Sequence, residues 1–206
     1  MDIKRGLYVA ACVLAGVAIL TVSIAKATLD INAREDNEDK LRSVPINFMV
    51  DKKDGTSEAI SYNLPVASML PSNPLYGFKR VRDYLWMFFA KGSINKSKIM
   101  LLIADKKMAE AKALIDNSQT KMALESVQEA LDQLKYAHNT IALEDIETGE
   151  VSQIKTKVYE AGLAYSEILK PIGQTFDLDT GKYEQLVNDL NKWNEEKRQE
   201  NEANSY

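Results

Sequence analysis

The chain has 206 residues, of which 45% are hydrophobic and 27% are charged, a composition that excludes a mostly disordered or collagen-like chain. With only 9 glycines and 5 prolines, a fold built of many short strands is disfavoured and helices are expected. A single cysteine and a single histidine exclude an intramolecular disulfide and the common zinc sites. The net charge of −4 gives no reason to expect a nucleic-acid partner.

The N-terminal part contains an apolar segment. Residues 7–25 include no charge, and a helix of that length spans about 28 Å, close to the thickness of a bilayer core. A buried core helix normally keeps a polar stripe, so a single transmembrane helix is the preferred interpretation. Lys4 and Arg5 precede the segment and the acidic stretch 30–40 follows it. The positive-inside rule therefore predicts a single-pass protein of the cytoplasmic membrane, with its N-terminus inside and its C-terminal domain outside.

A removable signal peptide is the rival interpretation, because Ala25-Lys26-Ala27 fits a cleavage site and the protein would then be secreted after cleavage near Ala27. The apolar run is longer than the hydrophobic region of most signal peptides, so an uncleaved anchor is preferred. The predicted organisation has four parts. A cytoplasmic stub with the anchor covers residues 1–27, and a charged stalk with a hairpin covers 28–69. A helical bundle covers 70–200, and a disordered tail covers 201–206.

A small β-hairpin is predicted over residues 45–64. Two runs with alternating apolar residues, 46–50 and 59–64, flank Asp54-Gly55, a dipeptide typical of hairpin turns. An isolated hairpin is marginally stable, so it either packs on another part of the chain or remains loose.

From Leu70 onward the pattern is helical, and the predicted fold class is all-α apart from the hairpin. Ser72-Asn73-Pro74 is typical of a helix start, with a capping side chain and proline in the first turn. Apolar residues at spacings of three and four then predict helices over roughly 74–90, 94–115, 119–143, 151–168 and 183–193. Because each helix has one apolar face, four to five of them are expected to form an antiparallel bundle.

A family resemblance begins at Leu70. A Leu-Pro pair, Pro-Leu-Tyr and Lys-Arg on one helix are followed by Ala-x-x-Lys-Met-x-Glu-Ala on the next. Over residues 64–141 this pattern resembles an uncharacterised bacterial helical family, domain of unknown function 5667. The resemblance implies an exported or membrane-anchored helical protein and no known activity. The motif residues are Leu70, Pro71, Pro74, Leu75, Tyr76, Lys79, Arg80, Lys107 and Glu110.

The motif admits a structural interpretation and a functional one. Lys79 and Arg80 could meet carboxylates across a helical hairpin, with Asp105 and Glu110 as candidates, or they could form an anion-binding patch. The structural interpretation is preferred, because surface charges are usually solvated or paired. Lysine stands at position 107, where arginine is commoner in the family, so a bidentate contact is not expected there.

The first helix of the bundle is unusually aromatic. Its side chains Tyr84, Trp86, Phe88 and Phe89 follow three basic residues. Such a helix either lies at the core of the bundle or rests on a membrane surface with its basic residues at the headgroups. Burial is preferred, because the second and third helices each offer an apolar face to their nearest neighbour.

The search for catalytic groups finds no pattern that selects a site. His138 falls on an apolar helical stripe and is interpreted as a packed residue, and no nucleotide-binding or nucleophile motif is present. The acidic turn 144–150 could hold calcium, but acidic turns are usually solvated. No metal and no cofactor is predicted.

The leading hypothesis is a membrane-anchored extracytoplasmic module without a catalytic site, which binds a protein or a cell-envelope component. Its predicted partners are the membrane, through residues 7–25, and that envelope component. The alternatives are an exported enzyme using paired carboxylates, such as an envelope hydrolase, and a helical domain lying on the membrane surface. A transmembrane signal transducer is disfavoured, because residues 1–6 are too few to fold in the cytoplasm.

Overall fold

The computed structural model describes residues 43–51, 55–67, 69–175 and 180–203. The predicted anchor at 7–25, the cytoplasmic stub and the first part of the stalk lie outside the described residues. Among the helices that are described, none combines the length and the apolar character that a membrane crossing requires.

The predicted hairpin is confirmed. Strands β1 (Ser43–Asp51) and β2 (Ser57–Pro65) pair antiparallel, with Phe48 opposite Ile60 and Asn47 opposite Ser61. Side chains alternate between the two faces of the strands, and Phe48, Tyr62 and Leu64 are buried. Strand β2 packs on α3 (Ser93–Asp116), and both strands pack on α5 (Gly149–Leu169). This packing provides the support that an isolated hairpin lacks.

The predicted helices are also found, close to their expected bounds. The structure contains α2 (Tyr76–Phe89), α3, α4 (Thr120–Ile141), α5, the single turn α6 (Ile172–Thr175) and α7 (Thr180–Ala203). The turn α6 was not predicted. Helix α7 continues past Trp193, the predicted end of its apolar spacing, and includes residues 201–203 of the predicted disordered tail, whereas 204–206 lie outside the described residues. Ion pairs one turn apart, such as Arg198–Glu195, support this extension.

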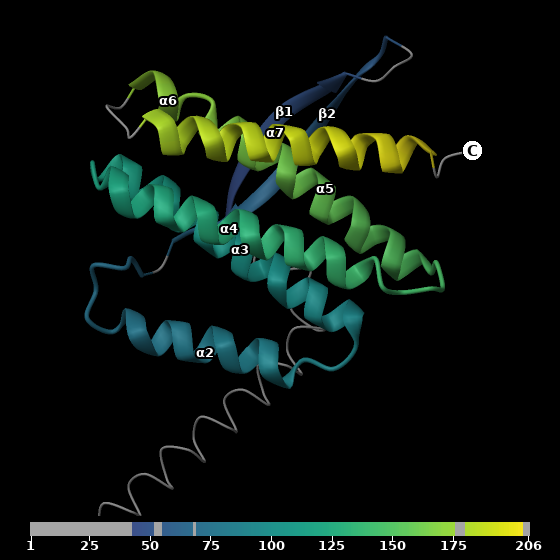
Figure 1. The fold of residues 1–206 in the computed structure, drawn as a ribbon, viewed down its shortest axis with the longest axis horizontal. Helices are drawn as coiled ribbons and strands as arrows, with labels where there is room; N and C mark the ends of the chain where they lie inside the picture. Colours follow the sequence, from purple (N-terminus) through teal and green to yellow (C-terminus); the bar gives the residue numbers. More distant parts are fainter. Residues whose placement is uncertain (1–42, 52–54, 68, 176–179, 204–206) are drawn as a thin grey trace, which may run out of the picture. The chain divides into compact units, whose positions relative to one another are not determined.

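Helices α3 and α4 form the centre of the bundle. They run antiparallel, and the Ser97 hydroxyl near the start of α3 donates a 2.7 Å hydrogen bond to the Ala137 carbonyl near the end of α4. Helix α5 packs on both of them, and α7 packs on α4 and α5 (Figure 1). The largest fully buried side chains of this core include Met108, Leu114, Leu131, Leu134, Ile141 and Tyr165. The described part of the chain is therefore mostly α-helical with one small antiparallel sheet.

Gly162 permits the close approach of α5 and α7. A Cβ atom at this position would lie 2.3 Å from Asn194 Oδ1 and 2.5 Å from a ring carbon of Trp193. The Asn194 amide donates to the Gly162 carbonyl at 3.1 Å and to Ser166 Oγ at 2.9 Å, so it has little freedom to move.

We expect Gly162→Ala to lower the free energy of unfolding by about 1–3 kcal/mol, because the added methyl group overpacks this contact. Urea unfolding of the full chain in a nonionic detergent measures the change. Gly77→Ala is the matched control, since Gly77 is helical and a Cβ there meets open space. It should be neutral or slightly stabilising. Similar effects of the two substitutions would contradict a packing role for Gly162.

Candidate interaction surface on helix α2

Helix α2 begins at Tyr76, two residues after the predicted start at Pro74. Asn73 Oδ1 accepts a 2.9 Å hydrogen bond from the Leu75 amide, and the Tyr76 amide donates to the Asn73 carbonyl at 2.9 Å. Pro74 therefore lies in the turn before the helix and not in its first turn, because the Asn73 side chain closes that turn. Of the remaining motif residues, Leu70 packs against the core, Pro71 is partly buried and Leu75 is exposed.

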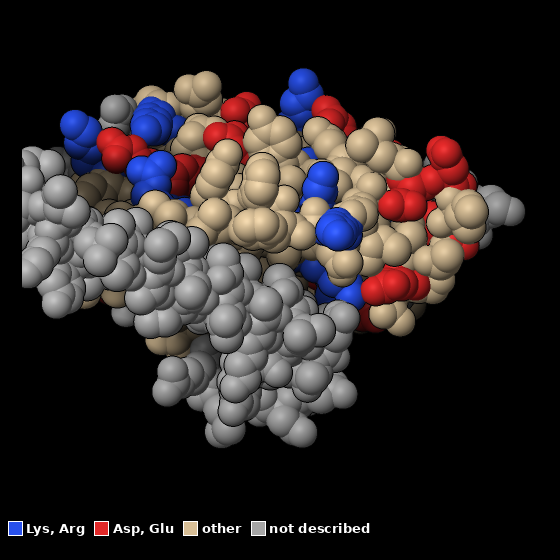
Figure 2. All heavy atoms as spheres, turned by 90° about the horizontal axis from the view of Figure 1, so that it is seen from below, with Lys and Arg blue, Asp and Glu red and all other residues tan. Residues whose placement is uncertain are grey.

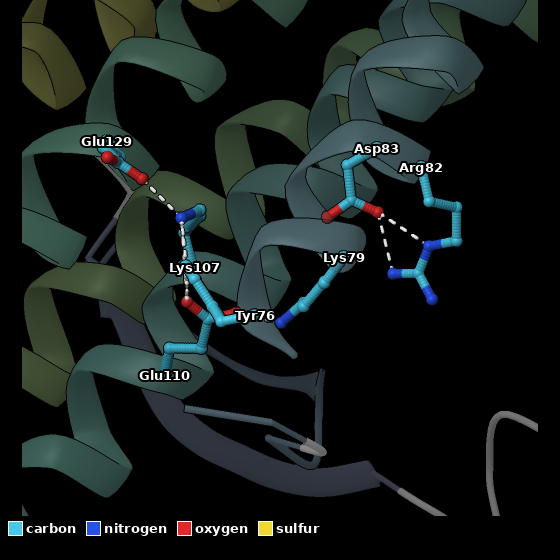
Figure 3. A network of polar contacts seen from close by, with 7 residues as sticks. All are labelled: Tyr76, Lys79, Arg82, Asp83, Lys107, Glu110 and Glu129. Carbon is cyan, nitrogen blue, oxygen red and sulfur yellow. Dashed lines mark hydrogen bonds and ion pairs between the residues drawn. The ribbon is translucent and has the colours of Figure 1, made fainter. Parts of the chain in front are cut away.

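A buried polar network joins α2 to α3. Glu110 of α3 has no exposed surface and receives a 2.7 Å hydrogen bond from the Tyr76 hydroxyl on Oε2. Lys79 of α2 forms an ion pair with Glu110 Oε1. Lys107 donates to the Tyr76 hydroxyl at 2.6 Å, lies 3.7 Å from Glu110 Oε2 and forms an ion pair with Glu129 of α4 (Figure 3). Four of the predicted motif residues, Tyr76, Lys79, Lys107 and Glu110, thus meet in one cluster.

Two members of the network, Tyr76 and Lys107, have a raised pKa. Burial raises the pKa of Tyr76 to about 12, and its hydrogen bond to Glu110 acts in the same direction. Burial lowers the pKa of Lys107, but the contacts with Glu129 and Tyr76 outweigh this effect and the net pKa is raised. Both groups therefore remain hydrogen-bond donors near neutral pH. The cluster is arranged to hold α2 in place and not to transfer a proton.

The predicted pairing of Lys79 with Glu110 is present, whereas Arg80 is exposed. Asp105 lies in another part of the core, where it accepts hydrogen bonds from Tyr62 and Tyr165. Sequence reasoning missed Glu129, because spacing along α4 does not reveal which side chain faces Lys107.

It also missed Asp83, which is buried on α2 and accepts 2.8 and 3.1 Å hydrogen bonds from Arg82. Asp83 lies four residues after Lys79, a spacing that places the two side chains next to each other on the helix and could have indicated its role.

The inward side of α2 is thus largely polar. Its buried residues are Lys79 and Asp83. Trp86 is partly buried beside Ile99 and Ile103 of α3. The Arg82 guanidinium and the Lys106 ammonium lie 4.8 and 4.6 Å from the centre of the Trp86 ring, which are cation–π distances. The polar network, together with the packing of Trp86 and Met87 against Ile99 and Ile103, holds the helix on the bundle.

The opposite side of α2 is apolar and exposed. We call this surface the outer face of α2, and its residues are Leu75, Phe78, Val81, Tyr84, Phe88 and Phe89, each between 49% and 75% exposed. Successive residues of a helix are turned by about 100°, which places these side chains on one broad side. Seen from the α2 side of the molecule, uncharged side chains form a broad area with Lys and Arg nearby (Figure 2).

The predicted burial of the aromatic helix is therefore wrong for Tyr84, Phe88 and Phe89, and only partly right for Trp86. The physical reason is that α3 already buries its apolar side against α4, α5 and the hairpin. The side of α3 that meets α2 contributes Lys107 and Glu110, which require polar partners.

Among the described residues outside the network, two carboxyl groups have a raised pKa. Burial raises the pKa of Asp105 to about 7, although hydrogen bonds from Tyr165 and Tyr62 act to lower it. Burial and the neighbouring charge of Glu58 raise the pKa of Glu160. Asp105 is buried and accepts from two hydroxyls: Tyr165 at 2.7 Å and Tyr62, which lies 2.9 Å from both carboxylate oxygens. These contacts join β2, α3 and α5.

Two candidates remain from the sequence analysis, His138 and the acidic turn 144–150. His138 packs edge-on against Trp193 at a centroid distance of 5.8 Å, and burial lowers its pKa. In the described ranges, no group of three or more His, Cys, Asp or Glu side chains is placed to hold a metal ion, and this includes the acidic turn 144–150.

The comparisons with known proteins assign the family. No curated protein and no solved structure matches the chain. A family described as Domain of unknown function (DUF5667) matches residues 68–175, which is 108 of the 206 residues. The match includes α2, α3, α4 and α5, with every member of the polar network, and it reaches beyond residue 141, where the resemblance was predicted to end. The chain therefore belongs to the family of Domain of unknown function (DUF5667).

Proposed function

We propose that this protein is a membrane-anchored, extracytoplasmic binding module without a catalytic site, and that the outer face of α2 is its binding surface. The observation that carries the proposal is the exposure of six large apolar side chains on one side of a single helix. Soluble monomeric proteins rarely expose a contiguous apolar patch of this kind unless it contacts a partner.

The polar network supports this role, because it fixes the orientation of α2 before any partner binds. Buried charges that are paired define a specific arrangement more strictly than apolar contacts, which tolerate repacking. The apolar segment 7–25 supports the membrane location, and Lys4 and Arg5 support the orientation with the bundle outside.

An exported enzyme with paired carboxylates is the alternative. The carboxyl group whose pKa is raised furthest, Asp105, is buried and bonded to two tyrosine hydroxyls. A general acid must reach the substrate, and these contacts occupy the oxygens that would do so. The observations therefore favour binding over catalysis.

One labelling experiment tests both the location and the binding surface. Cys12 is the single cysteine, so Phe88→Cys and Asn188→Cys can each be made in a Cys12→Ser chain. Both positions are exposed, the first on the outer face of α2 and the second on α7. In intact bacterial protoplasts we expect a membrane-impermeant maleimide to label position 188 readily and position 88 slowly. After purification in detergent and removal of any bound partner, the two rates should become similar.

The two halves of the proposal fail in different ways. Labelling of position 188 only after permeabilisation would contradict the extracytoplasmic location. Equal labelling of both positions in intact protoplasts would show that the outer face of α2 is unoccupied and would contradict its role as the binding surface.

A further inference from the structure

We infer that the outer face of α2 binds the bilayer itself, and that α2 lies in the interfacial region of an anionic membrane. The inference rests on the proposed function and specifies its ligand as a lipid surface. Three features of the described residues carry it: the inverted polarity of α2, the distribution of charge around it and the chemistry of its exposed side chains.

The polarity of α2 is inverted relative to an ordinary surface helix. Such a helix turns its apolar side to the core and its charges to water. In α2 the buried residues are Lys79 and Asp83, whereas Phe78 and Phe88 are 75% and 69% exposed. This arrangement is expected when the surroundings of the helix are apolar, as they are at the boundary between lipid headgroups and acyl chains.

The charge distribution is complementary to anionic lipid. Residues 79–107 contain eight Lys or Arg and only two acidic residues, a net charge of 8 − 2 = +6. Since the whole chain has a net charge of −4, the remainder carries −4 − 6 = −10. Lys79, Lys98 and Lys107 of this stretch are paired with glutamates. Arg80 on the aromatic helix, Lys91 in the link that follows it and Lys96 in the first part of α3 are exposed. Lys and Arg near a membrane surface attract anionic headgroups, whereas the acidic remainder is repelled.

Two arginines flank the outer face of α2. Arg80 lies one turn from Tyr84, at one margin, and is exposed. Arg82 lies one turn from Phe78, and its side chain is 41% exposed, although its guanidinium also contacts Asp83 and Trp86. Basic residues at the margins of an apolar helical face can reach headgroups while the face enters the interface.

The exposed side chains are of a kind that a membrane interface accommodates. Phe78, Tyr84, Phe88 and Phe89 are aromatic, and aromatic side chains are favoured where hydrocarbon meets water. The face extends from Leu75 to Phe89, about 21 Å along the helix. The network of Tyr76, Lys107 and Glu110 holds this face outward. Binding therefore does not require folding of the helix, and an anchor at 7–25 would keep it close to the lipid.

Reconstitution of the full chain in vesicles tests the inference. The Phe88→Cys and Asn188→Cys variants are placed in vesicles of phosphatidylcholine alone or with about 30 mol% phosphatidylglycerol, a fraction that gives a negative surface potential. We expect position 88, relative to 188, to be protected from an impermeant maleimide in the anionic vesicles, and protection to fall with added salt. A fluorophore attached at 88 should be quenched by brominated lipid, and one at 188 should not.

Arg80 provides a matched pair of variants, because its side chain lies outside the polar network. Loss of one interfacial charge in Arg80→Gln should reduce the protection of position 88 in anionic vesicles by about fivefold. Arg80→Lys retains the charge and should keep most of the protection. Far-ultraviolet circular dichroism should be the same for both variants, since neither alters a buried contact.

The possible results separate this inference from the proposed function. Full accessibility of position 88 in both kinds of vesicle, with no quenching by brominated lipid, would overturn the inference. If position 88 were still protected in protoplasts, the proposed function would stand and a protein would be the occupant. Equal protection in neutral and anionic vesicles would overturn the requirement for anionic lipid. Accessibility in vesicles and in protoplasts would overturn both proposals.

Discussion

Replacing Glu110 by glutamine is expected to lower the free energy of unfolding by about 3–5 kcal/mol, a loss typical of removing one member of a buried charge pair. Glu110 has no exposed surface, and its carboxylate faces the ammonium groups of Lys79 and Lys107, which are themselves buried (Figure 3). The amide keeps the shape of the side chain but leaves both lysines without their shared counter-charge. The energetic cost is therefore mainly that of the buried Lys79 ammonium without its carboxylate partner, since Lys107 keeps its ion pair with Glu129.

Urea unfolding of the full chain in a nonionic detergent, followed by tryptophan fluorescence, measures this loss. Glu129→Gln is the matched control, because Glu129 also pairs with Lys107 but its side chain is 46% exposed. Removal of an exposed partner should cost less than about 1 kcal/mol. Hydrogen exchange should show in addition that α2 opens more readily in Glu110→Gln. Equal small losses for the two variants would mean that the network does not hold α2.

The second large effect concerns the pH dependence of stability. Burial raises the pKa of Asp105 to about 7 in the folded chain, against an ordinary value of 3.8. The folded state therefore binds this proton more tightly than the unfolded state does. The resulting stabilisation is fully present below about pH 4 and is lost as the pH rises through about 7. The two pKa values correspond to a change of about 4 kcal/mol in the free energy of unfolding.

Asp105→Asn should remove this dependence. Between about pH 5 and about pH 8, the free energy of unfolding of the unsubstituted chain should fall relative to that of the variant. The comparison cancels the contributions of His138 and Glu160, which titrate in both proteins. Asparagine can still accept from one tyrosine and donate to the other, so the variant is expected to fold. Parallel pH profiles for the two proteins would contradict the raised pKa.

The order of the elements and their approximate bounds followed from local patterns. Alternation on both sides of Asp54-Gly55 predicted the hairpin, and spacings of three and four predicted five long helices, because these periods reflect the geometry of each element alone. These apolar spacings did not predict where α7 ends. Its last turns lack an apolar stripe and are supported by ion pairs such as Lys197–Glu200.

Part of the polar network could also be predicted. The resemblance at Leu70 drew attention to Tyr76, Lys79, Lys107 and Glu110. Charge complementarity between consecutive helices made Asp105 and Glu110 the candidate partners of Lys79 and Arg80, and of these pairs the structure contains Lys79–Glu110. The position of Asp105 could not be predicted in this way. Its partners Tyr62 and Tyr165 are 43 and 60 residues distant and come from a strand and a later helix.

The sequence by itself determined which elements form, that α2 is amphipathic and that this helix combines aromatic and basic residues. Only the tertiary structure decided which side of α2 faces the bundle. Hydrophobicity alone favours burial of the aromatic side. That preference is overridden because α3 presents Glu110 and Lys107 at the contact, and buried charges without partners cost more than exposed aromatic side chains. Lys79 therefore points inward, and Phe78 and Phe88 remain on the surface.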